Sequence, residues 1–298
     1  MASLKNILLI GAGGNLGLPV LEALLAIPSY KVRVLARKES TSVFPEGVPV
    51  FKADYSKQAE IQLAMEGQDV VICMVEPFAT GNQNIFIDAA IAAGVKRFFP
   101  SEFGPPSRDP RFVDLKLHVV PAKAATVDYL RTKESQISWT SIVTGLFFDW
   151  AVKGGVLGLD PITKTARLVD GGTTVLTASN LPYIAKAVLA CLDQAEQTKN
   201  QYVYIGEFHV SQTDVMAAFE KVQGQEWTTE NLDSETIIAA GQKKLEDGDK
   251  SGVKDLIWGG TCGKRGLGDS RPWGLWDDKL GLEKASLEKV VSGILATW

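Results

Sequence analysis

The sequence predicts an α/β fold with a doubly wound parallel sheet and a smaller C-terminal domain, and three observations support this. Residues 7–10 (Ile-Leu-Leu-Ile) form an apolar run that leads directly into a glycine-rich turn and then into a stretch of helical periodicity. Further apolar runs alternate with amphipathic stretches as far as about residue 150. Strands that are apolar throughout are typical of a sheet covered on both faces, and right-handed crossovers then give a Rossmann-type sheet.

The alternation defines the expected elements in order. After the first strand and its helix, strands are expected at residues 31–36, 48–52, 69–73, 96–100 and 139–143. Helices are expected at residues 58–65, 84–93 and 118–133 between them, and at 181–192, 213–222 and 284–295 beyond them. A further strand at residues 201–205 could rejoin the sheet.

The loss of this alternation near residue 150 predicts two domains. Residues 1–150 are expected to bind a dinucleotide, with 180–206 returning to that domain, and residues 151–298 to form mainly a smaller substrate-binding domain. The charged residues 241–252 are expected to be solvated. The glycine-rich stretch that follows carries Trp258, Trp273 and Trp276, which would form a lid over the substrate or anchor a long loop.

The turn after the first strand is the main functional signal. Gly11, Gly14 and Gly17 have the G-x-x-G-x-x-G spacing, and Gly13 adds a shorter one. Glycines let the backbone approach a ligand closely, and the helix N-terminus favours a pyrophosphate. A structural turn that binds nothing is the alternative, but the position between strand and helix favours a dinucleotide. The residues expected at the cofactor here are Gly11, Gly13, Gly14, Asn15, Leu16 and Gly17.

The end of the second strand indicates which dinucleotide binds. The position 20 residues after Gly17 is Arg37, followed by Lys38, and no carboxylate comes before Glu39. Two cations pair with a 2′-phosphate, whereas a carboxylate would select the free 2′-hydroxyl of NAD. An ordinary exposed strand end is the alternative. The prediction is NADPH/NADP+.

Lys123 is the predicted catalytic residue, and it is also expected to contact the cofactor. Tyr129 and Lys133 match the Y-x-x-x-K pattern, but they come at the far end of their helix, with Lys133 about 15 Å along the axis from Lys123, rather than near the strand ends that carry ligands. Lys123 lies in the first turns, with Val119 where a tyrosine would be expected. A partly buried lysine beside a nicotinamide could transfer a proton, although a lysine that only binds ribose is the alternative.

Other residues follow from the position of the strand ends. Val75 follows the fourth strand and is expected at the cofactor. Phe103 and Phe147 follow the fifth and sixth strands, and they would stack on an aromatic substrate or belong to the core.

Composition excludes several classes of function. The formal net charge is −4 and the chain has no basic stripe, which argues against nucleic acid. Three distant cysteines and two histidines indicate a reducing compartment and give no metal site. No leader or apolar run of about 18 residues is present, so a cytoplasmic protein without a membrane segment is expected.

Together these residues resemble the NmrA-like/isoflavone-reductase-like family of atypical short-chain dehydrogenases, in its fungal branch. The resemblance rests on the turn at residues 11–17, Arg37, the stretch Arg-Phe-Phe-Pro-Ser-Glu-Phe-Gly at 97–104, and Lys123 without its tyrosine. It implies NADPH-dependent reduction of aromatic natural products with Lys123 as acid or base. Gly13 stands where the family usually has threonine.

The predicted function is therefore reduction of a small aromatic or polyketide-like secondary metabolite by hydride transfer to an enone, quinone-methide-like or carbonyl carbon. Two alternatives stay open at this point. One is a non-catalytic, NAD(P)-sensing regulator that binds a protein partner, and the other is a redox-neutral isomerase or cyclase. The expected partner is a small-molecule substrate, a homodimer is left open, and neither nucleic acid nor a membrane is expected.

Overall fold

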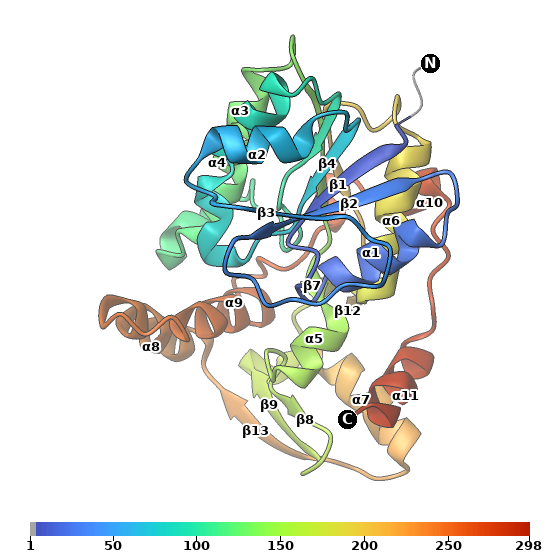
Figure 1. The fold of residues 1–298 in the computed structure, drawn as a ribbon. Helices are drawn as coiled ribbons and strands as arrows, with labels where there is room; N and C mark the ends of the chain where they lie inside the picture. The colour runs from blue at the N-terminus through green and yellow to red at the C-terminus, as the bar shows by residue number, and fades with distance from the viewer. Residues whose placement is uncertain (1–3) are drawn as a thin grey trace.

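The computed structural model describes residues 4–298, and its centre is a seven-stranded sheet in the order β11-β6-β5-β4-β1-β2-β3 (Figure 1). Every neighbouring pair in this sheet is parallel. The strand order reverses between β1 and β4, which is where an open α/β sheet binds its ligand. In order along the chain the strands are β1 (Asn6–Ile10), β2 (Lys31–Arg37), β3 (Val50–Ala53), β4 (Val70–Cys73), β5 (Arg97–Phe99), β6 (Ser138–Val143) and β11 (Gln201–Tyr204).

Helices cover both faces of this sheet because successive strand residues point to opposite sides. In β1, Leu9 packs beneath α1 (Gly17–Leu25) and α6 (Leu181–Asp193). Its neighbour Leu8 packs on the opposite face. The helices of that second face are α2 (Gln58–Met65), α3 (Asn84–Ala92) and α4 (Val119–Arg131).

The parallel sheet and its Rossmann-type connections confirm the predicted fold class. Strand and helix ends differ from the expected ranges by up to three residues. The third strand begins at Val50 rather than at residue 48, and the last helix, α11 (Leu287–Ala296), begins three residues later than expected. Strand β11 lies at the edge of the sheet beside β6.

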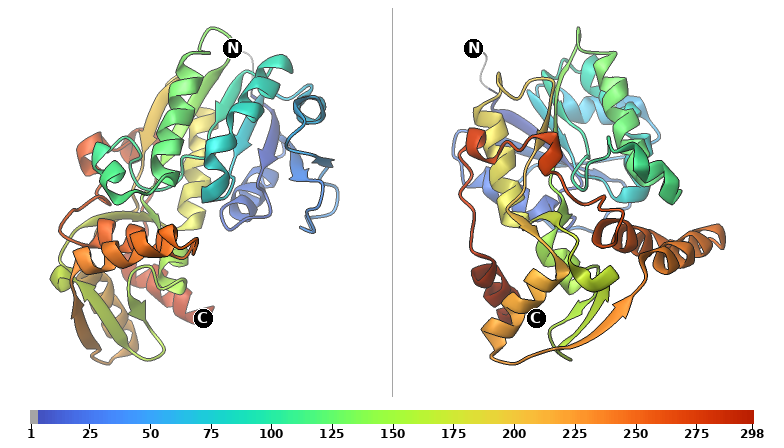
Figure 2. Two further views of the ribbon diagram at one scale, coloured as in Figure 1. Left: turned by 90° about the vertical axis from the view of Figure 1, so that its left-hand side faces the viewer. Right: turned by 180° about the vertical axis from the view of Figure 1, so that it is seen from behind.

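Two small sheets that the sequence did not predict lie below the large sheet in the views of Figures 1 and 2. Together with four helices they enclose a second core, which includes Phe148, Phe219 and Trp258. The first small sheet contains β7 (Leu146–Phe147), β10 (Leu176–Ser179) and β12 (Phe208–Val210), and the second contains β8 (Leu159–Asp160), β9 (Thr165–Val169) and β13 (Thr228–Leu232). The helices are α5 (Phe148–Lys153), α7 (Gln212–Gln223), α9 (Gly252–Cys262) and α11.

Residues 241–252, which the sequence analysis expected to be solvated, are only partly so. Their side chains are mostly exposed, but the stretch joins two packed helices, α8 (Ser234–Glu246) and α9 (Gly252–Cys262). The helices approach closely where Gly252 meets Gly241, since a Cβ on Gly252 would lie 2.3 Å from the Gly241 carbonyl oxygen. The glycines therefore allow the helices to pack, which charge composition alone does not reveal.

The tryptophan-rich segment lies against the sheet. The Trp273 ring stacks on Tyr204 of β11, and the Trp276 backbone N–H donates to the Tyr204 carbonyl over 2.8 Å. Trp258 is buried in the second core. These contacts favour the anchor interpretation over the lid.

Short helices complete the described chain: η1 (Pro77–Asn82), η2 (Pro110–Leu115), η3 (Asp170–Gly172), η4 (Arg271–Trp273) and α10 (Asp277–Leu280). Among residues 4–298, none of the helices combines the length and apolar character needed to cross a bilayer.

Candidate functional site

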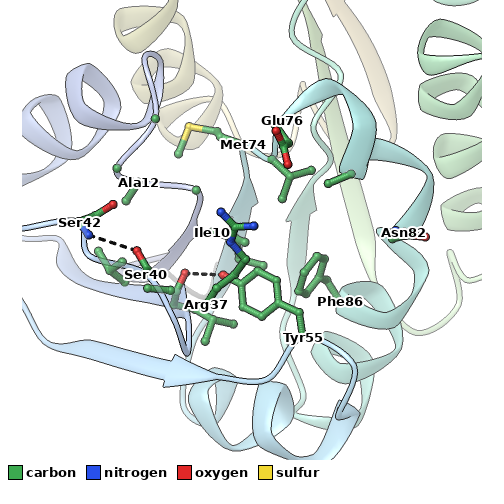
Figure 3. Close-up of a pocket in the computed structure, with 18 of the residues that line it drawn as sticks. Ile10, Ala12, Arg37, Ser40, Ser42, Tyr55, Met74, Glu76, Asn82 and Phe86 are labelled. Atoms are coloured by element: carbon green, nitrogen blue, oxygen red, sulfur yellow. Dashed lines mark hydrogen bonds between the residues drawn. The ribbon is translucent and has the colours of Figure 1, made fainter. Parts of the chain in front are cut away.

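A cavity of about 830 Å³ lies at the carboxyl ends of β1, β2 and β4 (Figure 3). Its floor is the glycine-rich turn that follows β1, and one wall is the end of β2 with the loop at residues 40–44. The opposite wall is formed by Val75, η1 and the start of α3. The cavity therefore occupies the switch point of the sheet, where the fold places a ligand.

The glycine-rich turn is packed so tightly that Gly11 and Gly17 leave no room for a Cβ. Gly11 has a φ of +81°, and a Cβ on it would lie 2.2 Å from the Met74 carbonyl oxygen. A Cβ on Gly17 would lie 2.2 Å from the Gly11 carbonyl oxygen. No side chain caps the N-terminus of α1, which leaves backbone N–H groups at this end. The turn is thus a backbone cradle suited to a pyrophosphate.

Replacing Gly11 by alanine should lower the free energy of unfolding by at least about 2 kcal/mol, because the new Cβ meets a backbone carbonyl and the φ is unfavourable for an L-residue. Gly14→Ala is the matched control. Its Cβ would come no closer than 3.3 Å to the Gly11 carbonyl oxygen, at an ordinary φ. Chemical denaturation of both variants tests this difference, and equal stabilities would contradict the packing described for Gly11.

The structure brings together only some of the residues expected at the cofactor. Gly11, Gly13, Gly14, Arg37 and Val75 line the cavity, whereas Asn15, Leu16, Gly17, Lys38 and Lys123 do not. Leu16 belongs to the core. Lys38 is exposed, and its backbone N–H donates to the Ala53 carbonyl over 2.9 Å.

Arg37 is the cation that the cavity wall presents. Its side chain is exposed and lies near the rings of Tyr55 and Phe86 in the cavity lining, which meet edge to face at 4.9 Å (Figure 3). The Tyr55 hydroxyl is held by the Leu35 carbonyl at 2.9 Å. Two flat apolar rings beside a guanidinium can hold an adenine with its phosphate. The sequence analysis missed both rings.

Lys123 is enclosed between the loop that follows β5 and the first turns of its own helix, α4. Its side chain is 9% exposed, and Nζ donates to the Phe103 carbonyl over 2.8 Å and to the Glu102 carbonyl over 3.1 Å. A Cβ on Gly104, whose φ is +151°, would lie 3.0 Å from Nζ, so a side chain here would press on the ammonium group. Burial lowers the pKa of the Lys123 ammonium, and the charge of Glu102 raises it.

Glu102 is a second buried ionisable group that the sequence analysis did not identify. Its side chain is fully buried, and its carboxyl oxygens make no hydrogen bond with the described residues. Burial raises the pKa of this carboxyl to about 7, while the charge of Lys123 lowers it. A buried cation and a buried carboxyl that shift each other's pKa are a pattern found at functional sites.

The cavity wall is tied directly to the helix that carries Lys123. A Cβ on Gly81 of η1 would contact the Ala122 side chain at 3.8 Å, and η1 packs on α4. At the end of β5, the Ser101 hydroxyl donates to the Val75 carbonyl over 3.0 Å, and its backbone N–H donates to Gln83 Oε1 over 2.7 Å. The cavity and the lysine are therefore parts of one packed unit.

The two residues of the Y-x-x-x-K pattern, Tyr129 and Lys133, lie outside the cavity lining. The Tyr129 hydroxyl donates to Asp88 Oδ1 over 2.6 Å, and the Lys133 amine lies 5.2 Å from the centre of the Tyr129 ring. The hydrogen bond and burial raise the pKa of Tyr129 to about 12, which makes it a poor proton donor near neutral pH.

Neither aromatic residue proposed for substrate lines the cavity. Phe103 is buried in the core beneath α1 and α6, and Phe147 is half-buried against the same core. Among residues 4–298, no group of three or more His, Cys, Asp or Glu side chains is arranged to hold a metal ion.

Comparison with known proteins identifies the family. The NmrA-like family model matches residues 3–240. The chain belongs to the NmrA-like family. Among curated relatives, "Oxidoreductase aprR" of Aspergillus flavus is 33% identical over 293 residues, which cover 97% of this chain and 98% of that protein. "Isoflavone reductase homolog IRL" of Zea mays is 31% identical over 256 residues, covering 80% and 81%.

Solved structures share the fold of this NmrA-like chain. The structure described as "AtPrR2 with NADP+ and (+)pinoresinol" superposes with a TM-score of 0.81 at 19% identity, covering 99% of this chain and all of that one (100%). The structure of an isoflavone reductase superposes with a TM-score of 0.79 at 19% identity, covering 98% and 99%. At these identities the likeness extends to the fold, and the resemblance inferred from residues 97–104 and Lys123 agrees with the family.

Proposed function

We propose that this NmrA-like chain is an NADPH-dependent reductase of a small aromatic or polyketide-like secondary metabolite, with Lys123 as its acid or base. The observation that carries the proposal is a cavity at the switch point with a glycine turn on one side, whose opposite wall, η1, packs on the helix that holds a buried lysine in its first turns. Assignment to the oxidoreductases rests on relatives of that description that match nearly the whole chain. Beyond that assignment, the proposal names NADPH as the cofactor and a small aromatic or polyketide-like metabolite as the substrate.

The cavity fits NADPH. The turn at Gly11–Gly14 would hold the pyrophosphate through its backbone N–H groups, because the turn lines the cavity and leads into the N-terminus of α1. Arg37 would pair with the 2′-phosphate, and Val75 would lie along the nicotinamide half. When bound, NADPH supplies the hydride for the reduction.

Lys123 would supply the proton. Its ammonium is held by the carbonyls of Glu102 and Phe103, which fix its position without removing its charge. Because burial lowers the pKa of Lys123, the ammonium is a stronger acid than an exposed lysine and can protonate an oxygen that becomes negative. Placed near the reacting carbon, Lys123 then acts as the general acid.

The domain division expected from the sequence is part of the proposal. Residues 1–150 with 180–206 would hold the cofactor, and residues 151–298, which supply all strands of the two small sheets except β7, would border the substrate. Phe147, at the start of the first small sheet, would be the substrate contact nearest this border. Only 7% of the surface of Phe103 is exposed, so this residue would support the substrate site from within the core.

A turnover assay tests the proposal. Purified protein should consume NADPH when supplied with a panel of aromatic enones and quinones, and the loss of NADPH absorbance measures the rate. Comparable affinity for NADPH and NADP+, with no turnover of any substrate, would instead favour the regulator.

A further inference from the structure

Glu102 and Lys123 are two buried ionisable groups whose charges stabilise each other when both are ionised. The Glu102 carboxyl is fully buried, and its own backbone carbonyl accepts a hydrogen bond from Lys123 Nζ. Lys123 in turn makes no ion pair within 4.0 Å among the described residues, because its bonds go to carbonyls. A buried charge without compensation is costly. Each group therefore depends on the charge of the other.

Lys123 is the charge that acts most strongly on Glu102, and the other facing groups contribute less. Arg108, on the loop after β5, also lowers the pKa of Glu102 through its charge, but its guanidinium is paired with Asp128 at 2.8 Å. The remaining facing groups are uncharged near neutral pH: the Ser107 hydroxyl, and the phenols of Tyr202 and Tyr204 on β11. Burial and the charge of Glu102 raise the pKa of both phenols, so neither becomes a counter-charge.

We propose that Glu102 is a positioning residue that keeps Lys123 protonated through the charge of its enclosed carboxylate. This inference rests on the proposed role of Lys123. Glu102 does not carry the transferred proton: Lys123 gives a proton from its ammonium to the substrate oxygen, and its neutral amine then takes one from solvent. The carboxylate stabilises the ammonium before and after this exchange. Without it, the lysine would lose its proton at a lower pH.

The direct test is the titration of Lys123 in the full chain. Lysine labelled with ¹³C at Cε reports the pKa by NMR, and Lys123→Met identifies the resonance. In Glu102→Gln we expect the Lys123 pKa to fall by at least one unit, about tenfold in the protonation equilibrium. Glu102→Asp should bring it back toward the wild-type value because it restores the charge. An unchanged Lys123 pKa in folded Glu102→Gln would overturn the proposal.

Kinetics provide a second readout that separates positioning from folding. The pH above which kcat falls should move down in Glu102→Gln by the same amount as the Lys123 pKa, while the KM for NADPH stays unchanged. A uniform loss of kcat at every pH would contradict the proposal. If Lys123→Met turns over normally, the proposed function of the lysine is wrong, but the NMR titration still decides whether Glu102 sets its pKa.

A stability cycle covers the case in which Glu102→Gln folds poorly. Either single variant, Glu102→Gln or Lys123→Met, leaves one buried charge unpaired and should lower the melting temperature. The double variant leaves none, so its melting temperature should lie above the value expected from adding the two losses. Additive losses would contradict the pairing.

Discussion

Lys123→Met is expected to lower kcat about 10²- to 10⁴-fold, the usual contribution of a general acid or base, while leaving NADPH affinity nearly unchanged. Methionine keeps the apolar stem of the lysine and removes only the ammonium. The side chain does not line the cavity, so its loss should not affect cofactor binding directly. Steady-state rates and calorimetric binding of NADPH measure the two effects separately.

Tyr129→Phe is the matched control for this variant. The Tyr129 hydroxyl is bonded to Asp88 and lies outside the cavity lining, so its removal should leave turnover as it is. Two results would contradict the assignment. Loss of turnover in Tyr129→Phe would restore the Y-x-x-x-K interpretation, and a loss of NADPH affinity with normal kcat in Lys123→Met would make the lysine a binding residue only.

Arg37→Ala is expected to weaken the binding of NADPH about 10- to 100-fold and to leave the binding of NADH nearly unaffected. A guanidinium pairs with the 2′-phosphate through charge-assisted bonds worth about 1.5–3 kcal/mol, and NADH lacks that phosphate. Arg37→Asp should lower the affinity for NADPH further, because the new carboxylate would repel the 2′-phosphate. Dissociation constants for both cofactors give the ratio directly.

Lys38→Ala is the comparison that shows whether the effect depends on position. Lys38 carries the same charge one residue further along, but it does not line the cavity. We therefore expect Lys38→Ala to change NADPH affinity much less than Arg37→Ala. If Arg37→Ala lowered the affinity for NADPH and for NADH equally, the proposed pairing of Arg37 with the 2′-phosphate would be wrong.

The large sheet was predictable because its strands are buried on both faces. Residues such as Leu8 and Leu9 are both apolar, and the helices between the strands carry a clear periodic pattern. The two small sheets were not predictable in this way. Strand β7 has only two residues, and β13 is mostly exposed, so neither gives an apolar run. Their positions are set by tertiary packing, which overrides local preference.

The site was predicted in outline and missed in part for similar reasons. The turn at Gly11–Gly14 and Arg37 follow from spacing along the first βαβ unit. Lys38 could have been excluded, because neighbouring residues at a strand end point to opposite sides. Nothing in the stretch around Glu102 indicates that its carboxyl is buried. Tyr55 reaches the cavity from a loop after β3, whose course the sequence does not specify.

The measurement that tests the central claim most directly is a calorimetric titration of the purified wild-type chain with NADPH and with NADH. The account predicts one NADPH bound per chain, with an affinity about 10- to 100-fold higher than that for NADH, because only NADPH offers a 2′-phosphate to Arg37. No binding of either cofactor, or equal affinity for the two, would contradict it.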